Sequence, residues 1–357
     1  QTHCIGTATT TRNMLKSSSK ENGWYRDRLR PEAKQRYLKK IECIANLDPY
    51  DIRQWSKDPD DLPPLSYPDI FTYLVCGVSA YTANQFRNYK SLESSTLPLS
   101  LACLHSTGAQ SLGLTELQLH CVKYINTAKV TEEQAEAIEV GTRLQHKSPE
   151  WYAWRAGRIT ASMMHAVFAT TVEKPAFTVI NRVCYPVNSV CNVQTTWGLE
   201  HEQDARHAYT QTMSACHKNL QVRMCGFLVN MAFPEVGASP DGLTTCECCG
   251  KGCLEIKCPF KYRCDSIQQA LNAHDKDFCL ELTAKGLNLK KTHRFYSQVQ
   301  TQVFVANAKH CDLVVWTQKD MAILRIFPDV HFWESHLKKA QEFFQKVCLP
   351  ELNGWAW

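Results

Sequence analysis

The sequence lacks the features that would mark a membrane or secreted protein. Its 357 residues contain no apolar run long enough to cross a bilayer, and residues 1–20 lack the apolar core of a signal peptide. The 18 cysteines are scattered through segments with helix and strand patterns, unlike those of a small disulfide scaffold. We therefore expect reduced thiols, an intracellular location in the nucleus or cytoplasm, and no membrane partner. The absence of an initiator methionine before Gln1 is typical of a fragment of a longer protein.

A strong excess of one charge is also missing. The net charge is only +5, with 44% hydrophobic and 21% charged residues, which is ordinary for a folded globular protein. Residues 1–50 contain ten Lys/Arg and five Asp/Glu, so the whole basic excess lies there. Such a region is either the footprint of a polyanion such as DNA or an ordinary solvated helix surface, and the composition leaves both open.

Internal repeats are absent, and the pattern of apolar residues divides the chain into two parts. Residues 1–130 are interpreted as a helical accessory region with a basic amphipathic helix over 31–47. A capping-box pattern at Thr131 then opens a domain that continues to residue 357. Its pattern predicts helices near 149–156, 160–170, 197–215, 293–308 and 330–347, and strands near 221–232, 235–238, 253–258, 311–317 and 321–327. This order predicts an α/β domain in which helices flank a short mixed sheet.

The segment 238–259 contains the most informative motif. Asp241 follows Ser-Pro, and Glu255 and Lys257 alternate along a short apolar run. Because side chains alternate on a strand, Glu255 and Lys257 are expected on one face, and a hairpin through the intervening glycines would bring Asp241 beside Glu255. Two carboxylates with an adjacent ammonium are what a Mg²⁺-dependent phosphodiesterase needs. A surface hairpin with a simple Glu–Lys pair is the alternative.

Two further motifs predict side chains at the same place. On a predicted helix, Glu202 lies between the small residues Gly198 and Ala205, which allow a neighbouring element to approach closely. A carboxylate on that inward face needs a partner, which a metal ion would supply. Gln298 and Gln302 share one face of a later predicted helix, where neutral amides can orient water or phosphate. Taken singly, each motif also fits a solvated helix face.

A basic and hydroxyl-rich motif precedes these groups. Arg155 ends one predicted helix, and Thr160 and Ser162 follow a Gly break near the start of the next. A guanidinium, hydroxyls and free backbone N–H groups at a helix N-terminus together suit a phosphate. Thr160 as a simple N-cap is the alternative.

These motifs, in this order, resemble the YqaJ-type viral recombinases, a lambda exonuclease-like family of PD-(D/E)XK nucleases. The resemblance covers roughly residues 148–320. It rests on four groups of residues: Trp151, Arg155, Gly157 and 159–162; Trp197, Gly198, Glu202 and 204–206; 239–242 with 254–257; and 298–300. It implies a restriction-endonuclease-like (PD-(D/E)XK) core.

The resemblance also implies roles for the matching residues. The implied catalytic and metal-binding residues are Glu202, Asp241, Glu255, Ile256 through its backbone carbonyl, Lys257 and Gln298. Lys257 would stabilise or help to deprotonate the attacking water, and Gln298 would position that water or the substrate phosphate. The implied binding site for a terminal 5′-phosphate consists of Arg155, Thr160 and Ser162.

The activity implied by the resemblance is a DNA exonuclease with one or two Mg²⁺ or Mn²⁺ ions. It would digest duplex ends, with 5′ to 3′ polarity, in recombination, repair or mobile-element processing. A homo-oligomer and a single-strand-annealing partner protein are compatible with it. The alternatives are an endonuclease, a single-strand or RNA nuclease with the same metal core, and a catalytically silent DNA-binding module. The intact set of Asp241, Glu255 and Lys257 argues against the silent module.

Cysteines are concentrated in the loop between the two acids of the main motif. The loop contains Cys246, Cys248, Cys249 and Cys253. Clustered thiolates can hold structural Zn²⁺, which would make this a Cys-rich interaction domain. However, two separated Cys-x-x-Cys pairs are lacking, which favours a tight turn with reduced thiols. Further zinc ligands from elsewhere in the chain would be Cys184, Cys191 or Cys225.

Overall fold

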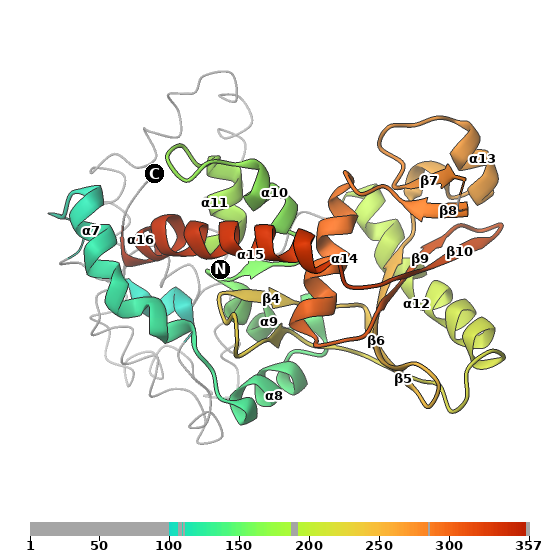
Figure 1. Cartoon of the computed structure of the whole chain (residues 1–357), viewed down its shortest axis with the longest axis horizontal. Coiled ribbons are helices and arrows are strands. Elements are labelled where there is room, and N and C mark those ends of the chain that lie inside the picture. Colours follow the sequence, from blue (N-terminus) through green and yellow to red (C-terminus); the bar gives the residue numbers. More distant parts are fainter. Residues whose placement is uncertain (1–99, 106–108, 110, 187–191, 285, 355–357) are drawn as a thin grey trace, which may run out of the picture. The chain divides into compact units, whose positions relative to one another are not determined.

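The structure, a computed structural model, describes residues 100–354 except 106–108, 110, 187–191 and 285 (Figure 1). The predicted basic helix over 31–47 and most of the predicted accessory region lie outside these residues. The division at residue 130 therefore stays a prediction. In the part of the chain that is described, no helix has the length and apolar character needed to span a membrane.

A five-stranded mixed sheet is the centre of the fold. Its strands have the order β10-β9-β6-β5-β2, with β6 and β9 parallel and the other neighbours antiparallel. Their bounds are Gln221–Arg223 (β2), Gly242–Cys246 (β5), Gly250–Lys257 (β6), Cys311–Trp316 (β9) and Met321–Ile326 (β10). β5 and β6 form a hairpin that pairs Gly242 with Leu254. The predicted mixed sheet and the predicted hairpin are both confirmed.

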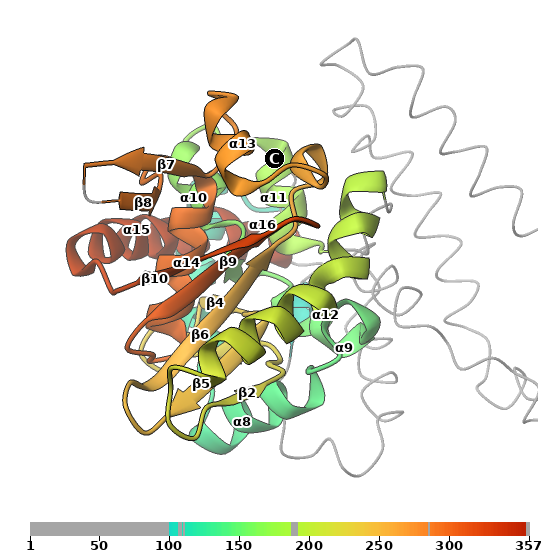
Figure 2. The same ribbon diagram turned by 90° about the vertical axis from the view of Figure 1, so that its right-hand side faces the viewer.

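Helices cover both faces of β6, with α12 on one side and α14 on the other (Figure 2). α12 (Val193–Ser214) packs on one face through a shared apolar cluster that contains Ala205, Tyr209, Leu254, Ile256 and Val314. α14 (Arg294–Val305) packs on the other face, in a cluster that contains Cys253, Val299, Val303, Cys311 and Leu313. Burial on both faces explains the apolar residues Cys253, Leu254 and Ile256 of β6, among which Glu255 is a buried exception.

A small second sheet leads into the main hairpin. It has the order β1-β4-β3 and consists of Ile159–Thr160 (β1), Leu228–Val229 (β3) and Val236–Ala238 (β4). The prediction that a helix begins at 160 is wrong, because β1 pairs in parallel with β4 and α10 (Met164–Ala169) begins only after it. The β-branched pair of β1 is buried against β4, a long-range contact that overrides the local pattern.

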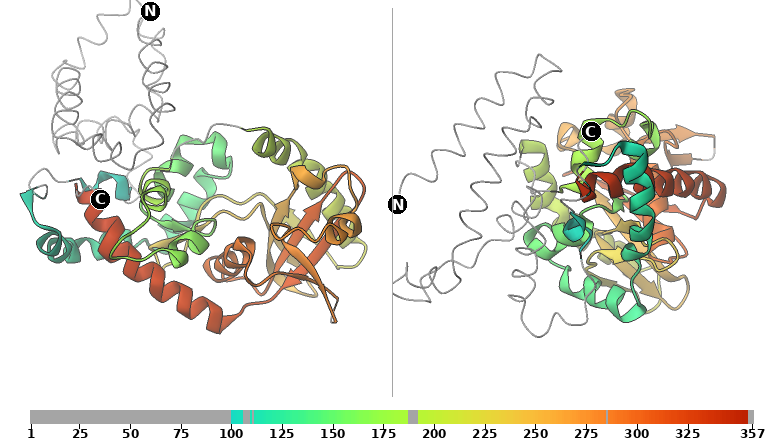
Figure 3. Two further views of the ribbon diagram at one scale, coloured as in Figure 1. Left: turned by 90° about the horizontal axis from the view of Figure 1, so that it is seen from above. Right: turned by 90° about the vertical axis from the view of Figure 1, so that its left-hand side faces the viewer.

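The other described elements surround these two sheets (Figure 3). They are η3 (Leu101–Leu104), α7 (Leu114–Cys121), η5 (Val122–Ala128), α8 (Glu132–Gly141), η6 (Gln145–Lys147), α9 (Pro149–Arg155), α11 (Phe177–Cys184), η7 (Phe260–Tyr262), α13 (Ile267–Asn272), β7 (Leu280–Thr283), β8 (Gly286–Leu289), α15 (Val330–Phe343), η8 (Phe344–Cys348) and α16 (Leu349–Asn353). The predicted strand over 221–232 is broken into β2 and β3. The predicted last helix continues through a π-helical turn, η8, into α16. The predicted capping box at Thr131 is confirmed.

Gly226 is required where the connection between β2 and β3 passes α8. A Cβ at this position would lie 1.8 Å from the carbonyl oxygen of Glu139 and 2.6 Å from Oγ1 of Thr142. We expect Gly226→Ala to lower the free energy of unfolding by about 3 kcal/mol, measured by urea denaturation, because backbone must move to remove the overlap. Gly198→Ala is the matched control, since a Cβ there meets nothing within 4 Å and alanine favours a helix. Equal stability of the two variants would contradict the prediction.

Candidate active site

Three acidic side chains gather where the hairpin meets α12. Asp241 directly precedes β5, and its Oδ2 accepts a hydrogen bond of 2.6 Å from the backbone N–H of Ile256 on β6. Glu255 lies on β6 with a side chain that is only 1% exposed. Burial, followed by repulsion from Glu255 and from Glu202 of α12, raises the pKa of Asp241 well above its ordinary value. The cluster therefore needs positive charge to hold all its carboxylates ionised.

Glu255 is held in place by donors from its own strand and from α14. Lys257 Nζ and Gln298 Nε2 both donate to Oε1 of Glu255, and Gln302 Nε2 donates to Oε2. Strand alternation brings Lys257 to Glu255, and the i, i+4 spacing brings both glutamines to the same carboxylate. Gln302 is one donor more than the resemblance implies, and only its helical spacing from Gln298 indicates it in the sequence.

Lys257 carries positive charge at this cluster. Its burial alone would lower its pKa, but the carboxylates of Glu255 and Asp241 outweigh that effect and raise it. Its ammonium also lies 4.8 Å from the centre of the Phe295 ring. At neutral pH the side chain is therefore a hydrogen-bond donor and a cation.

Arg206 also belongs to the site, although the sequence alone predicts no role for it. Its side chain is largely buried, Nη2 donates to Oε1 of Glu202, and Nη1 donates to the backbone carbonyl of Asp241. One guanidinium therefore ties α12 to the segment that presents Asp241. The available signal was the i, i+4 spacing of Glu202 and Arg206 within one motif.

The three predicted phosphate-binding residues belong to two pairs of neighbouring side chains, Arg155 with Trp151 and Thr160 with Ser162. The Arg155 guanidinium lies 3.7 Å from the ring centre of Trp151, whose Nε1 donates over 2.8 Å to Ser239 Oγ, two residues before Asp241. Burial lowers the pKa of Arg155 to about 10, so it stays charged at neutral pH.

The second pair comprises Thr160 and Ser162, whose hydroxyl oxygens are 3.2 Å apart. Thr160 belongs to β1, and α10 has Met163 at its N-cap without a side-chain cap, so the N-cap alternative for Thr160 is wrong. Among the described residues, no hydrogen bond joins Arg155 to either hydroxyl.

A comparison with protein families identifies the type of domain that contains this site. Residues 150–309 match the family model of the YqaJ-like viral recombinase domain. This part of the chain is similar to that family. The family predicted from the four motifs is therefore confirmed, and the YqaJ-like domain contains every residue of the candidate site described above.

The YqaJ-like domain has viral relatives. Over 230 residues the chain is 27% identical to the alkaline nuclease of Autographa californica nuclear polyhedrosis virus, covering 60% of this chain and 52% of that protein. Over 243 residues it is 28% identical to the alkaline nuclease of Orgyia pseudotsugata multicapsid polyhedrosis virus, covering 64% and 54%. The chain thus spans about half the length of these relatives. An alkaline exonuclease structure from Laribacter hongkongensis aligns with a TM-score of 0.41 and 22% identity, covering 55% of this chain and 90% of that one.

The acidic cluster of the YqaJ-like domain has the right chemistry for a hard divalent cation. Nucleases of this family are metal-dependent in general. Carboxylate oxygens suit Mg²⁺ or Mn²⁺, and a cation would relieve the repulsion that raises the pKa of Asp241. In this structure Lys257, Gln298, Gln302 and Arg206 hold the oxygens of Glu255 and Glu202.

The cysteines separate into two environments. Among the described residues, the potential metal ligands that all lie within 4.8 Å of one another are His217, Cys246, Cys248 and Cys249. The assignment of Cys253 to this set is wrong, because its thiol is fully buried on β6 and points to the carbonyl of Gln302 at 3.6 Å. Cys184 and Cys225 are buried in apolar clusters, and Cys191 lies outside the described residues.

Proposed function

We propose that this chain is a metal-dependent DNA exonuclease that hydrolyses phosphodiester bonds from duplex ends, 5′ to 3′, with Mg²⁺ or Mn²⁺. The observation that carries the proposal is the meeting of Asp241, Glu255 and Lys257 at one end of the β5–β6 hairpin in a YqaJ-like domain. Similarity to two viral alkaline nucleases supports the hydrolysis of nucleic acid. We further propose that the protein acts in recombination, repair or mobile-element processing.

In this proposal the acidic cluster binds the cation through Asp241, Glu255, the carbonyl of Ile256 and Glu202. When bound, the cation lowers the pKa of a water and neutralises charge on the phosphoryl and leaving oxygens. Lys257 donates a hydrogen bond to the attacking water or to the negative charge that develops on the phosphate. Gln298 positions that water or the phosphate while it also orients Glu255. No covalent nucleophile of the protein is required.

We propose that Arg155, Thr160 and Ser162 recognise the terminal 5′-phosphate. Because Trp151 links Arg155 to the Ser-Pro-Asp segment, a phosphate held there would be fixed relative to Asp241. A guanidinium and two hydroxyls suit a dianionic terminal phosphate better than an internal monoanionic one. This site is the reason for favouring an exonuclease over an endonuclease.

The test is digestion of an end-labelled linear duplex, with and without a 5′-phosphate, in Mg²⁺ and in EDTA. We expect release of mononucleotides in Mg²⁺ alone, faster from phosphorylated 5′ ends. Arg155→Gln should reduce the preference for phosphorylated ends about tenfold, because one charge-assisted hydrogen bond is lost. Arg155→Lys should restore part of it, since the positive charge remains.

The substrates that would overturn parts of this proposal are run beside the duplex. Cleavage of a closed circle would make the protein an endonuclease. Preference for single strands or RNA would make it a single-strand or RNA nuclease. DNA binding without cleavage in any divalent ion would leave a silent binding module.

A further inference from the structure

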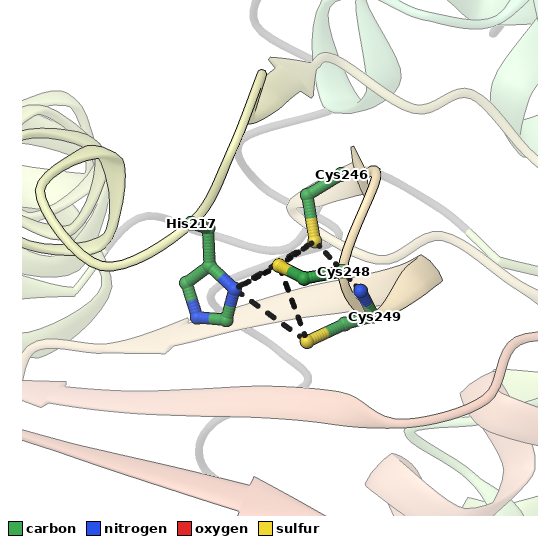
Figure 4. Close-up of side chains that lie close together, drawn as sticks. All are labelled: His217, Cys246, Cys248 and Cys249. Atoms are coloured by element: carbon green, nitrogen blue, oxygen red, sulfur yellow. Dashed lines mark hydrogen bonds between the residues drawn. The ribbon is translucent and has the colours of Figure 1, made fainter.

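Four side chains that the proposed nuclease mechanism does not use meet at the tip of the β5–β6 hairpin (Figure 4). Cys246 ends β5, Cys248 and Cys249 lie in the turn, and His217 follows the last turn of α12. His217 Nδ1 lies 3.0 Å from the sulfur of Cys248, 3.5 Å from that of Cys249 and 3.7 Å from that of Cys246. The sulfur of Cys248 lies 3.3 Å from that of Cys246 and 3.8 Å from that of Cys249.

These distances are close to the edges of a tetrahedron around zinc. Zinc bonds of about 2.3 Å to sulfur and 2.0–2.1 Å to nitrogen give edges of about 3.8 Å between sulfurs and about 3.5 Å between sulfur and nitrogen. A disulfide would need sulfurs about 2.05 Å apart, and the three cysteines are free thiols. The four ligands converge on one point and leave no position for a substrate.

The turn itself is built around a sulfur atom. Cys246 and Cys249 form a Cys-x-x-Cys pair. The backbone N–H of Cys249 donates a hydrogen bond of 3.2 Å to the sulfur of Cys246. Gly250 follows with a φ of 78°, a left-handed conformation that favours glycine. The sequence Cys246-x-x-Cys249-Gly250 therefore folds into a compact loop that presents its thiols to one side.

A network of charged side chains from β9 and β10 contacts this cluster. Arg325 Nη1 donates to the sulfur of Cys249 over 3.0 Å. Asp312, which is fully buried, fixes Arg325 through two hydrogen bonds of 2.8 Å and also accepts one of 2.7 Å from Tyr209. The guanidinium would thus donate a hydrogen bond to one sulfur ligand of a site in which three thiolates and one imidazole on Zn²⁺ carry a charge of −1.

We propose that His217, Cys246, Cys248 and Cys249 bind one structural Zn²⁺ ion. Three sulfurs and one nitrogen in tetrahedral array select zinc over the hard cation of the acidic cluster. The ion fastens the hairpin tip to the end of α12. Since α12 carries Glu202 and the hairpin carries Asp241, the zinc site holds together the two elements that form the acidic cluster. The site does not depend on the proposed nuclease activity.

The test is elemental analysis of the full chain after purification without chelator. We expect one zinc per chain, and less than a fifth of that content in His217→Ala and in Cys248→Ser. Cys216→Ser is the matched control, because Cys216 is exposed, adjoins His217 in the chain and lies outside the cluster. It should retain the full zinc content. Asp241→Asn should retain it as well, which separates this site from the acidic cluster.

Cobalt substitution of the wild-type chain covers the case in which the variants do not fold. Replacement of zinc by Co²⁺ should give the visible bands of a tetrahedral site and a thiolate-to-cobalt charge-transfer band. Wild-type protein without zinc and without this spectrum would overturn the proposal. Full zinc content in folded His217→Ala and Cys248→Ser would overturn it too.

Discussion

Asp241→Asn should lower the rate of DNA hydrolysis about a thousandfold while the protein stays folded. The substitution removes the charge that binds a cation, yet the amide oxygen can still accept the hydrogen bond from the N–H of Ile256. It also relieves the repulsion from Glu255 and Glu202 that raises the pKa of Asp241. We therefore expect unchanged or slightly higher thermal stability in the absence of metal. The measurement is the initial rate on an end-labelled duplex at saturating Mg²⁺, together with a thermal unfolding curve.

Asp204→Asn is the matched control for this loss. Asp204 lies on α12, two residues from Glu202, but its side chain is 60% exposed and pairs with His201. We expect it to retain at least half of the activity, because an exposed charge contributes little. If Asp204→Asn and Asp241→Asn lost activity equally, a general effect of charge on DNA binding would replace the assignment of Asp241. A folded Asp241→Asn protein with wild-type activity would contradict the assignment of Asp241 to the metal site.

The parts of this site that sequence predicts are those set by local geometry. Strand alternation places Lys257 with Glu255, and helical spacing places Gln298 with Gln302, whatever the rest of the fold does. The hairpin between Asp241 and Glu255 is also local, since glycines mark its turn. These short-range rules are enough to predict that Asp241, Glu255 and Lys257 lie together.

The parts that sequence does not predict depend on long-range packing. His217 joins the cysteine cluster only because the end of α12 lies beside the hairpin tip, 29 residues away from Cys246. A single histidine after a helix carries no local signal for that contact. β1 also depends on a long-range contact, since this strand of two residues exists only through its pairing with β4. The spacing of the cysteines alone therefore predicts Cys253 as a zinc ligand. On β6, however, strand alternation directs its side chain into the core.

A second feature without a sequence signal is Arg158, which is fully buried. Its Nε, Nη1 and Nη2 donate to the backbone carbonyls of Pro234 at 3.0 Å, Trp154 at 3.2 Å and Ala128 at 3.1 Å. Burial lowers the pKa of Arg158 to about 10, so the guanidinium is charged at neutral pH. One side chain thus satisfies three carbonyls from three separate segments.

Arg158→Met should lower the free energy of unfolding by about 4 kcal/mol, because three buried carbonyls lose their donor and the buried Glu235 loses a neighbouring positive charge. Arg143→Met is the control, since that side chain is 42% exposed and pairs with Glu139, which Arg223 also contacts. It should cost less than about 1 kcal/mol. Urea denaturation measures both values.

The same segments explain why the loss should be one of stability and not of chemistry. Arg158 joins the end of η5 to α9 and to the residues just before β4, so it fixes the α9 helix that carries Trp151 relative to the strand that leads to Ser239. The acidic cluster itself makes no contact with it. We therefore expect the rate of hydrolysis per folded Arg158→Met molecule to remain within about threefold of wild type at low temperature. A stable variant would show that packing alone holds these segments, whereas a stable but inactive one would place Arg158 in the catalytic machinery.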